Sequence, residues 1–198
     1  MYSTDTNTPQ SEIDQRIEKL RNQLDQNNIG AALMVQRADL FYFSGTIQEA
    51  HLYVPVDAEP ILMVFKSLDR AISESSLSRI VPLTSPKAIP DLLDQYGYKV
   101  PPVIGMELDV LPAMLYFSYQ KLFDEKSLID ISHLIRLVRA IKSPYEIDMM
   151  RRAAEGSDQL AACVPELLRE GMTELELAGK VEAEARKRGH QGIVRMRY

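Results

Sequence analysis

Three histidines and one cysteine are the scarcest reactive side chains in this sequence. His51, His133 and His190 include no pair at the i, i+4 spacing of a helical metal site, and none stands beside a cysteine. We interpret His133 as a surface or capping residue, whereas His51 and His190 each lie next to a predicted loop. Cys163 falls on the apolar stripe of a predicted helix, which favours an inert core thiol over a nucleophile.

Acidic residues are plentiful, but their spacing does not form a convergent set. Glu107 and Asp109 follow a predicted strand and could offer paired metal ligands, although two acids at such a turn are more often solvated. Glu182 and Glu184 fall on different faces of a predicted helix. The sequence also lacks a G-x-S-x-G elbow, a glycine-rich dinucleotide fingerprint and a P-loop. The residues themselves therefore predict no metal set, nucleotide site or nucleophilic catalysis.

Composition narrows the class of protein. Hydrophobic residues make up 45% of the 198 positions, which is ordinary for a globular protein. A net charge of −5 argues against a general nucleic-acid binder, and one cysteine excludes a disulfide framework. No apolar stretch approaches the roughly 20 residues that cross a bilayer, and no signal peptide is visible. We expect a cytoplasmic protein that binds neither nucleic acid nor membrane.

Up to residue 130, predicted strands alternate with predicted helices. Apolar runs bounded by turn residues predict strands at 31–35, 51–55, 60–65, 79–83, 103–106 and 127–130. Helical periodicity predicts helices at 11–28, 67–73, 89–96 and 112–123. Residues 57–59 predict a hairpin between two strands, so the sheet should be mixed rather than purely parallel. This pattern indicates an α/β layered domain.

The pattern changes near Lys142, which we take as a domain boundary. Residues 143–146 and 173–176 each form a predicted capping box at the start of a helix. Pro165 should kink or split the first of these helices. The pair, residues 143–189, has one broad apolar face that must pack against something. Because only nine residues follow it, we expect the chain to be cut short.

Four short segments form a pattern through their order and spacing. They are IGAAL at 29–33, ADLFYFSG at 38–45, IGME at 104–107 and IRLVRAIKSPYEI at 135–147. In this order they resemble the opening strand, the Tyr-Phe-Ser-Gly element, the Ile-Gly-x-Glu strand and the linker with first catalytic-domain helix of one family. That family is the creatinase/prolidase/Xaa-Pro aminopeptidase group, the pita-bread metallopeptidases. The resemblance covers essentially residues 12–198.

The resemblance implies a fold and a division into domains. It implies an α/β creatinase-type amino-terminal domain, with a mixed β-sheet flanked by helices, at residues 12–140. Residues 141–198 would be an αα-hairpin from the start of a truncated pita-bread domain. Separately, the composition of the first residues, rich in Ser, Thr and Asn, predicts a disordered tail at 1–11. Residues 193–197 are more basic than is typical of the family, which leaves the exact substrate open.

The resemblance also implies a function. Family members are hydrolases that cleave bonds preceding proline, or related amide and C–N bonds. They use two divalent cations, usually manganese, cobalt or zinc, which polarise a carbonyl and generate hydroxide. The family's ligands, two Asp, one His and two Glu, lie carboxy-terminal to residue 198. This chain should therefore contain no catalytic or metal-binding residue and be inactive alone, whereas the full-length protein would cleave short proline-containing peptides.

One role could remain in this chain. In related enzymes the amino-terminal domain forms a homodimer, and the loop corresponding to residues 46–51 helps to close the partner's active site. His51 could then hydrogen-bond a substrate carboxylate, and Gln48 could contact the substrate backbone. A solvated turn without substrate contact is the alternative for both residues. The alternative for the whole chain is a stand-alone, non-catalytic binding or dimerisation module of the same fold.

Overall fold

The computed structural model describes residues 7–190. The predictions for residues 1–6 and 191–198, including the basic stretch 193–197, lie outside the described residues. The described residues divide into two compact units, 7–141 and 142–190. Helix α1, Gln10–Gln26, begins within the predicted tail, and Thr8 before it is buried. Within residues 7–190, no helix combines the length and apolar character needed to cross a membrane.

A six-stranded sheet forms the centre of the first unit, in the order β4-β3-β2-β1-β5-β6. The β1–β2 and β2–β3 pairs are antiparallel, and the other neighbouring pairs are parallel. The predicted hairpin and the mixed sheet are therefore confirmed. All six predicted strands are present, as β1 Ala31–Met34, β2 Ala50–Pro55, β3 Ile61–Val64, β4 Ile80–Pro82, β5 Val103–Met106 and β6 Ser127–Asp130.

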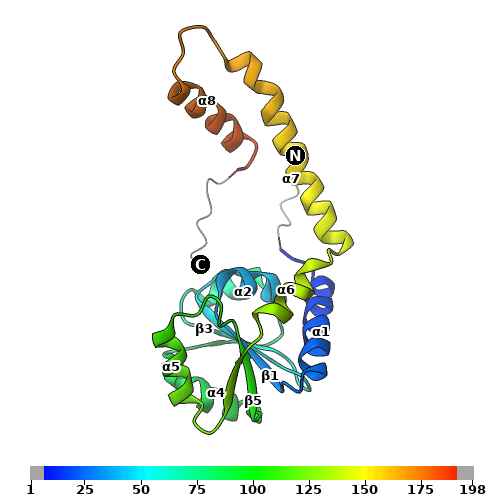
Figure 1. Cartoon of the computed structure of the whole chain (residues 1–198), viewed down its shortest axis with the longest axis vertical. Coiled ribbons are helices and arrows are strands. Elements are labelled where there is room, and N and C mark those ends of the chain that lie inside the picture. The colour runs from blue at the N-terminus through cyan, green and yellow to red at the C-terminus, as the bar shows by residue number, and fades with distance from the viewer. Residues whose placement is uncertain (1–6, 191–198) are drawn as a thin grey trace. The chain divides into compact units, whose positions relative to one another are not determined.

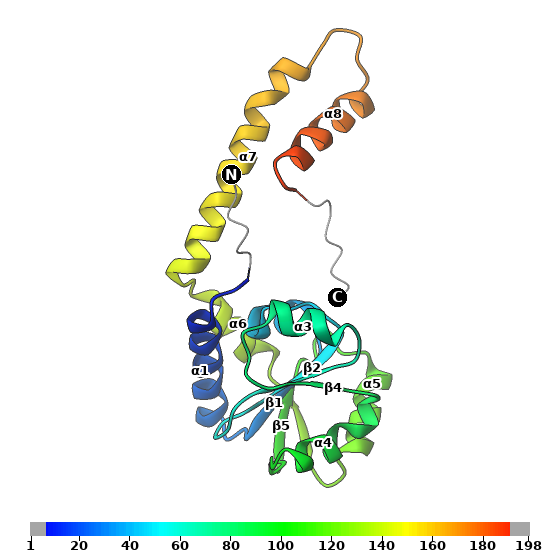
Figure 2. The same ribbon diagram turned by 180° about the vertical axis from the view of Figure 1, so that it is seen from behind.

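Helices cover both faces of this sheet (Figures 1 and 2). Alternate residues of β1 point to opposite faces, so Ala32 and Met34 join one core and Ala31 and Leu33 the other. The first core is closed by α1, α2 Arg37–Ser44, α3 Leu68–Glu74 and α6 Ser132–Ala140. The second is closed by α4 Ile89–Gln95, which follows a 3₁₀ turn at Pro86–Ala88, and by α5 Ala113–Leu122. The α/β fold class is thus confirmed.

Helix α2 is not predicted by the sequence pattern, because it is only eight residues long and rich in aromatic residues with modest helix propensity. Its ends explain why it forms. The Gln36 side chain accepts a hydrogen bond from the Asp39 backbone N–H at 3.2 Å, which caps the first turn. Gly45 ends the helix with φ of +81°, a left-handed conformation that glycine adopts without strain. These two caps fix where the helix that contains the Tyr-Phe-Ser-Gly segment begins and ends.

The second unit consists of α7 Pro144–Leu167 and α8 Glu174–Lys187. Both predicted capping boxes are confirmed: Ser143 Oγ accepts from the Glu146 N–H at 3.1 Å, and Thr173 Oγ1 from the Glu176 N–H at 3.2 Å. Pro165 does not split α7, because it lies in the last turn and the helix ends two residues later.

The apolar stripe of the second unit stays open in the described part of the chain. No residue of α7 or α8 is buried there, and Met150 and Leu168 are 56% and 57% exposed. Cys163 is half-buried, so the prediction of a core thiol is wrong for this unit. The reason is that two helices alone cannot enclose the stripe that they share.

Candidate functional site

The carboxyl ends of β1 and β5 form the position where an open α/β sheet most often carries a site. The two strands are parallel neighbours, and the chain leaves β1 toward α2 on one face and β5 toward α5 on the other. Such a topological switch point leaves a crevice outside the strand ends. Glu107 follows β5 directly, Asp39 lies in the first turn of α2, and His51 is the second residue of β2 beside β1.

Glu107 is a buried structural anchor rather than part of a solvated turn. It is 1% exposed, and its Oε2 atom accepts hydrogen bonds from the backbone N–H groups of Val35 at 2.8 Å and Gln36 at 3.3 Å. The expectation of a solvated turn is therefore wrong for Glu107, because β5 is an interior strand of the sheet and α2 begins over its end. It holds for Asp109, whose side chain is 39% exposed and pairs with Arg136 at 2.7 Å.

Glu107 shares its environment with a second buried acid. Its carboxyl group is hydrogen-bonded to that of Asp39, and Asp39 Oδ1 also accepts from Arg139 Nη1 at 2.8 Å. Burial raises the pKa of Glu107 to about 8. The charge of Asp39 also raises this pKa, whereas the two backbone N–H hydrogen bonds act to lower it. At neutral pH the raised pKa favours the protonated form of Glu107, which can donate a hydrogen bond to Asp39. This pair ties the β1–α2 turn to α6.

His51 faces the opposite side of the sheet, where α5 covers it. Its Nε2 atom lies 2.6 Å from the Tyr119 hydroxyl, and burial lowers the pKa of His51 to about 4. Burial also raises the pKa of Tyr119 to about 12. Neutral His51 can accept the hydroxyl proton at Nε2, and its buried Nδ1 then carries a hydrogen that has no partner among the described residues. The substrate role of His51 stays a prediction.

Gln48 lies in the loop that leads into β2. Its Nε2 atom donates to Glu74 Oε2 at 3.3 Å, and its backbone N–H to Thr46 Oγ1 at 3.3 Å. The structure thus places Gln48 and His51 on one connection, with Gln48 half-exposed in the loop and His51 on the strand. The contact of Gln48 with substrate also stays a prediction. The other two histidines, His133 and His190, are exposed, as expected for His133.

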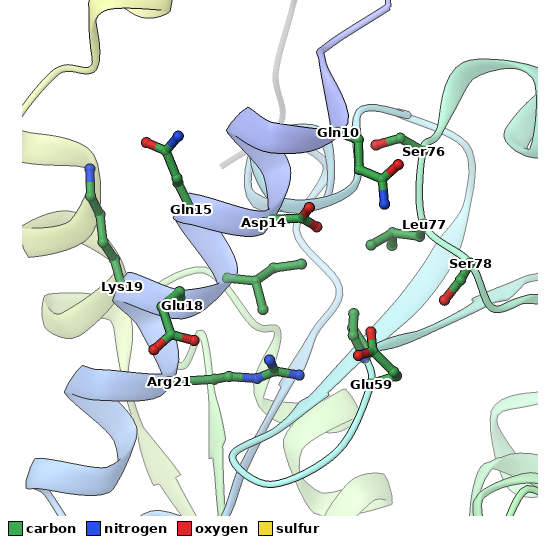
Figure 3. Close-up of a pocket in the computed structure, with 12 residues that line it drawn as sticks. Gln10, Asp14, Gln15, Glu18, Lys19, Arg21, Glu59, Ser76, Leu77 and Ser78 are labelled. Atoms are coloured by element: carbon green, nitrogen blue, oxygen red, sulfur yellow. The ribbon is translucent and has the colours of Figure 1, made fainter.

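A groove of about 660 Å³ lies elsewhere on the first unit, between α1, the β2–β3 hairpin and the connection from α3 to β4 (Figure 3). Asp14 and Glu59 project into it from opposite sides, near Arg21. Arg21 donates to the carbonyl oxygens of Pro55 and Ala58, so its charge ties α1 to the hairpin. Neither Gln48 nor His51 lines this groove.

We expect His51 to titrate near pH 4 rather than at its ordinary 6.5. A histidine that burial keeps neutral makes the unfolding free energy fall as the pH drops from about 6.5 to about 4. Proton-detected NMR of the imidazole will measure this midpoint. In Tyr119→Phe the midpoint should stay far below 6.5, because burial is the main cause; a midpoint above 6 in the unmodified chain would contradict the burial of His51.

A family model and several curated relatives match this chain. Residues 16–141 match the family model of the Creatinase/Prolidase N-terminal domain. The chain is 28% identical over 173 residues to the Xaa-Pro dipeptidase of Pyrococcus furiosus, and the match covers 85% of this chain and 47% of that protein. The chain spans about half the length of the curated relatives it matches.

Solved structures agree with this assignment. The prolidase from Pyrococcus furiosus matches with a TM-score of 0.76 at 27% identity, covering 88% of this chain and 54% of that chain. The Xaa-Pro dipeptidase from Bacillus anthracis shares the fold with a TM-score of 0.79 at 21% identity, covering 90% of this chain and 50% of that chain. The family model ends at residue 141, but these structural matches cover 88% and 90% of the chain. They therefore extend into the helical pair. The chain belongs to the creatinase/prolidase family, and residues 16–141 match its amino-terminal domain.

Proposed function

We propose that this chain is the amino-terminal portion of a metal-dependent Xaa-Pro peptidase that cleaves short proline-containing peptides in the cytoplasm. The match to the Xaa-Pro dipeptidase of Pyrococcus furiosus, at about half of that protein's length, is the observation that carries this proposal. In it, residues 12–140 are the amino-terminal domain, and residues 141–198 begin the pita-bread catalytic domain.

The metal ions belong to another part of this proposed enzyme. Residues 7–190 contain no group of three or more His, Cys, Asp or Glu side chains that could hold a metal ion. The described residues therefore do not fit a dinuclear centre of manganese, cobalt or zinc, and the ligands would lie in the half of the relatives that this chain does not match. On this proposal the chain alone binds no metal and is inactive.

The first unit would serve dimerisation and closure of the active site. Large apolar side chains on its surface support the first role: Phe41 is 48% exposed, Ile47 51%, Phe117 53% and Met114 76%. For the second role, the loop with Gln48 would cover the active site of the partner subunit. Gln48 is half-exposed and has amide donors for a peptide backbone. The buried Nδ1 of His51, which has no partner among the described residues, would have to become accessible to donate to a substrate carboxylate.

Proline release tests the proposed function. We expect the full-length protein to release proline from a Xaa-Pro dipeptide with stimulation by Mn²⁺ or Co²⁺, since a bound divalent cation supplies hydroxide near neutral pH. The present chain, assayed under the same conditions, should release none. A full-length protein that is inactive with every divalent metal tested would contradict the proposal.

A stand-alone binding or dimerisation module is the second candidate, and the two candidates differ in what they require of the open apolar face of α7. A module that works by itself should cover Ile147, Met150 and Leu168, which are 39%, 56% and 57% exposed. Size-exclusion chromatography and binding of a hydrophobic dye distinguish the two candidates. A defined oligomer without dye binding supports the module, whereas dye binding and aggregation support a portion of a larger enzyme.

A further inference from the structure

Glu74, the last residue of α3, is the point to which the Gln48 loop is attached. Its Oε2 atom accepts a hydrogen bond from Thr46 Oγ1 at 2.6 Å and a longer one from Gln48 Nε2 at 3.3 Å. Its Oε1 atom accepts from Arg70 Nε at 2.5 Å. One carboxylate therefore holds two residues of the loop while an arginine on its own helix orients it.

The backbone packing at this point agrees with the side-chain contacts. Thr46 is 1% exposed, so the hydroxyl end of its bond to Glu74 is screened from water. A Cβ atom on Gly45 would lie 3.3 Å from the Glu74 carbonyl oxygen, which shows how closely the loop approaches the end of α3. Thr46 Oγ1 also accepts the Gln48 backbone N–H, so the anchored threonine in turn orders Gln48. The Glu74 side chain is thus one anchor of the loop, beside the Ser44 hydroxyl at Thr46 and the hydrogen bond from the Phe65 N–H to the Glu49 carbonyl oxygen.

Apart from the i,i+4 ion pair with Arg70, the helix gives no reason for an acid at this position. A carboxylate in the last turn of a helix lies at the negative end of the helix dipole, which disfavours it. Partial burial acts to raise the pKa of Glu74, but the hydrogen bonds from Thr46, Arg70 and Gln48 outweigh it and lower that pKa. The contacts with the loop and with Arg70 together therefore favour the charged carboxylate that the helix end disfavours.

We propose that Glu74 is a positioning residue for the peptide hydrolysis proposed above. It holds Thr46 firmly and Gln48 exchangeably, because both bonds are part-buried but the first is 2.6 Å long and the second 3.3 Å. On substrate binding, the Gln48 amide leaves Glu74 for the peptide backbone while Thr46 stays in place. This inference rests on the proposed function, since it assigns a role within the same loop.

Two measurements on Glu74→Ala test this role. Amide hydrogen exchange of residues 46–48 should accelerate about tenfold, because the loop loses this anchor. In the full-length protein, the KM for a Xaa-Pro dipeptide should rise about fivefold, the loss of one charge-assisted contact, while kcat stays within about twofold. Glu74→Gln should be intermediate, since its amide oxygen can still accept from Thr46. Asp69→Asn, which removes an exposed charge from the same helix, is the matched control and should change neither quantity.

The outcomes separate this inference from the proposed function. An active wild-type enzyme whose Glu74→Ala variant keeps its KM would overturn the role of Glu74 alone. A fall in kcat with an unchanged KM would also overturn it, because a loop that only positions substrate acts on binding. A full-length wild type without Xaa-Pro activity would overturn the proposed function and this role together, and the exchange rates would still show whether Glu74 anchors the loop.

Discussion

Replacing Glu107 with glutamine should make the chain more stable at pH 8 than the wild type and leave its stability near pH 5 almost unchanged. The folded pKa of Glu107 is about 8 against an ordinary 4.5, so folding takes up a proton between these values. The wild-type unfolding free energy therefore falls as the pH rises from about 4.5 to about 8. Glutamine cannot ionise, yet it can donate to Asp39 and accept from the Val35 and Gln36 N–H groups. We expect a gain of roughly 2–4 kcal/mol at pH 8.

Urea unfolding followed by tyrosine fluorescence at several pH values measures this effect. The quantity to compare is the difference between wild type and Glu107→Gln, because the opposite pH dependence of His51 cancels in it. Asp109→Asn, at the exposed neighbouring acid, is the control and should show no such difference. Glu107→Ala should lose about 3 kcal/mol, since it leaves two buried N–H groups without an acceptor. A difference that does not grow between pH 5 and pH 8 would show that Glu107 is ionised in the folded chain.

Substituting alanine for Gly105 should destabilise the first unit by about 3 kcal/mol through overpacking. An added Cβ atom would lie 2.3 Å from Ile131 Cγ2 and 3.0 Å from Ile131 Cδ1. Ile131 is 1% exposed and belongs to the core beneath α6, so it cannot move aside without disturbing that core. Gly105 and Glu107 point to the same face of β5, where glycine admits Ile131 and the acid ties down α2. This explains the Ile-Gly-x-Glu segment physically.

A double-mutant cycle with Ile131→Ala checks the cause of this loss. Ile131→Ala alone should cost about 2–5 kcal/mol, and the double variant should be clearly more stable than the sum of the two losses predicts. Gly156→Ala is the control, because a Cβ on Gly156 in α7 meets nothing within 4 Å and should be neutral or mildly stabilising. Strict additivity of the first two substitutions would mean that the clash with Ile131 is not the source of the effect.

Much of the fold follows from local patterns. All six strands, the β2–β3 hairpin and both capping boxes of the second unit were predictable, because alternation, turn residues and cap spacing act within a few residues. Helix α2 was not, because it is too short for its periodicity to stand out and its N-cap is a glutamine. The family resemblance depends on the order of four segments along the chain, and no single segment identifies the family.

The candidate site could be predicted only in part. His51 and Gln48 come from the resemblance, and the structure places them on one connection without testing their substrate contacts. The sequence showed Glu107 as an acid after a strand, but it did not show that Glu107 is buried. Two acids that lie two residues apart give no indication of which elements pack over them. Glu74 gave no signal, since its partner Thr46 lies 28 residues away.

The sequence by itself determined the family, the order of the strands and the ends of the predicted helices, because these depend on neighbours along the chain. Only the tertiary structure decided which acids are buried. Asp39 meets Arg139 across 100 residues, and Glu107 meets the Val35 N–H across 72. Such contacts form when the sheet brings the ends of β1 and β5 together under α2 and α6. Removal of water at that point then determines the protonation of Glu107, because burial penalises its charged form.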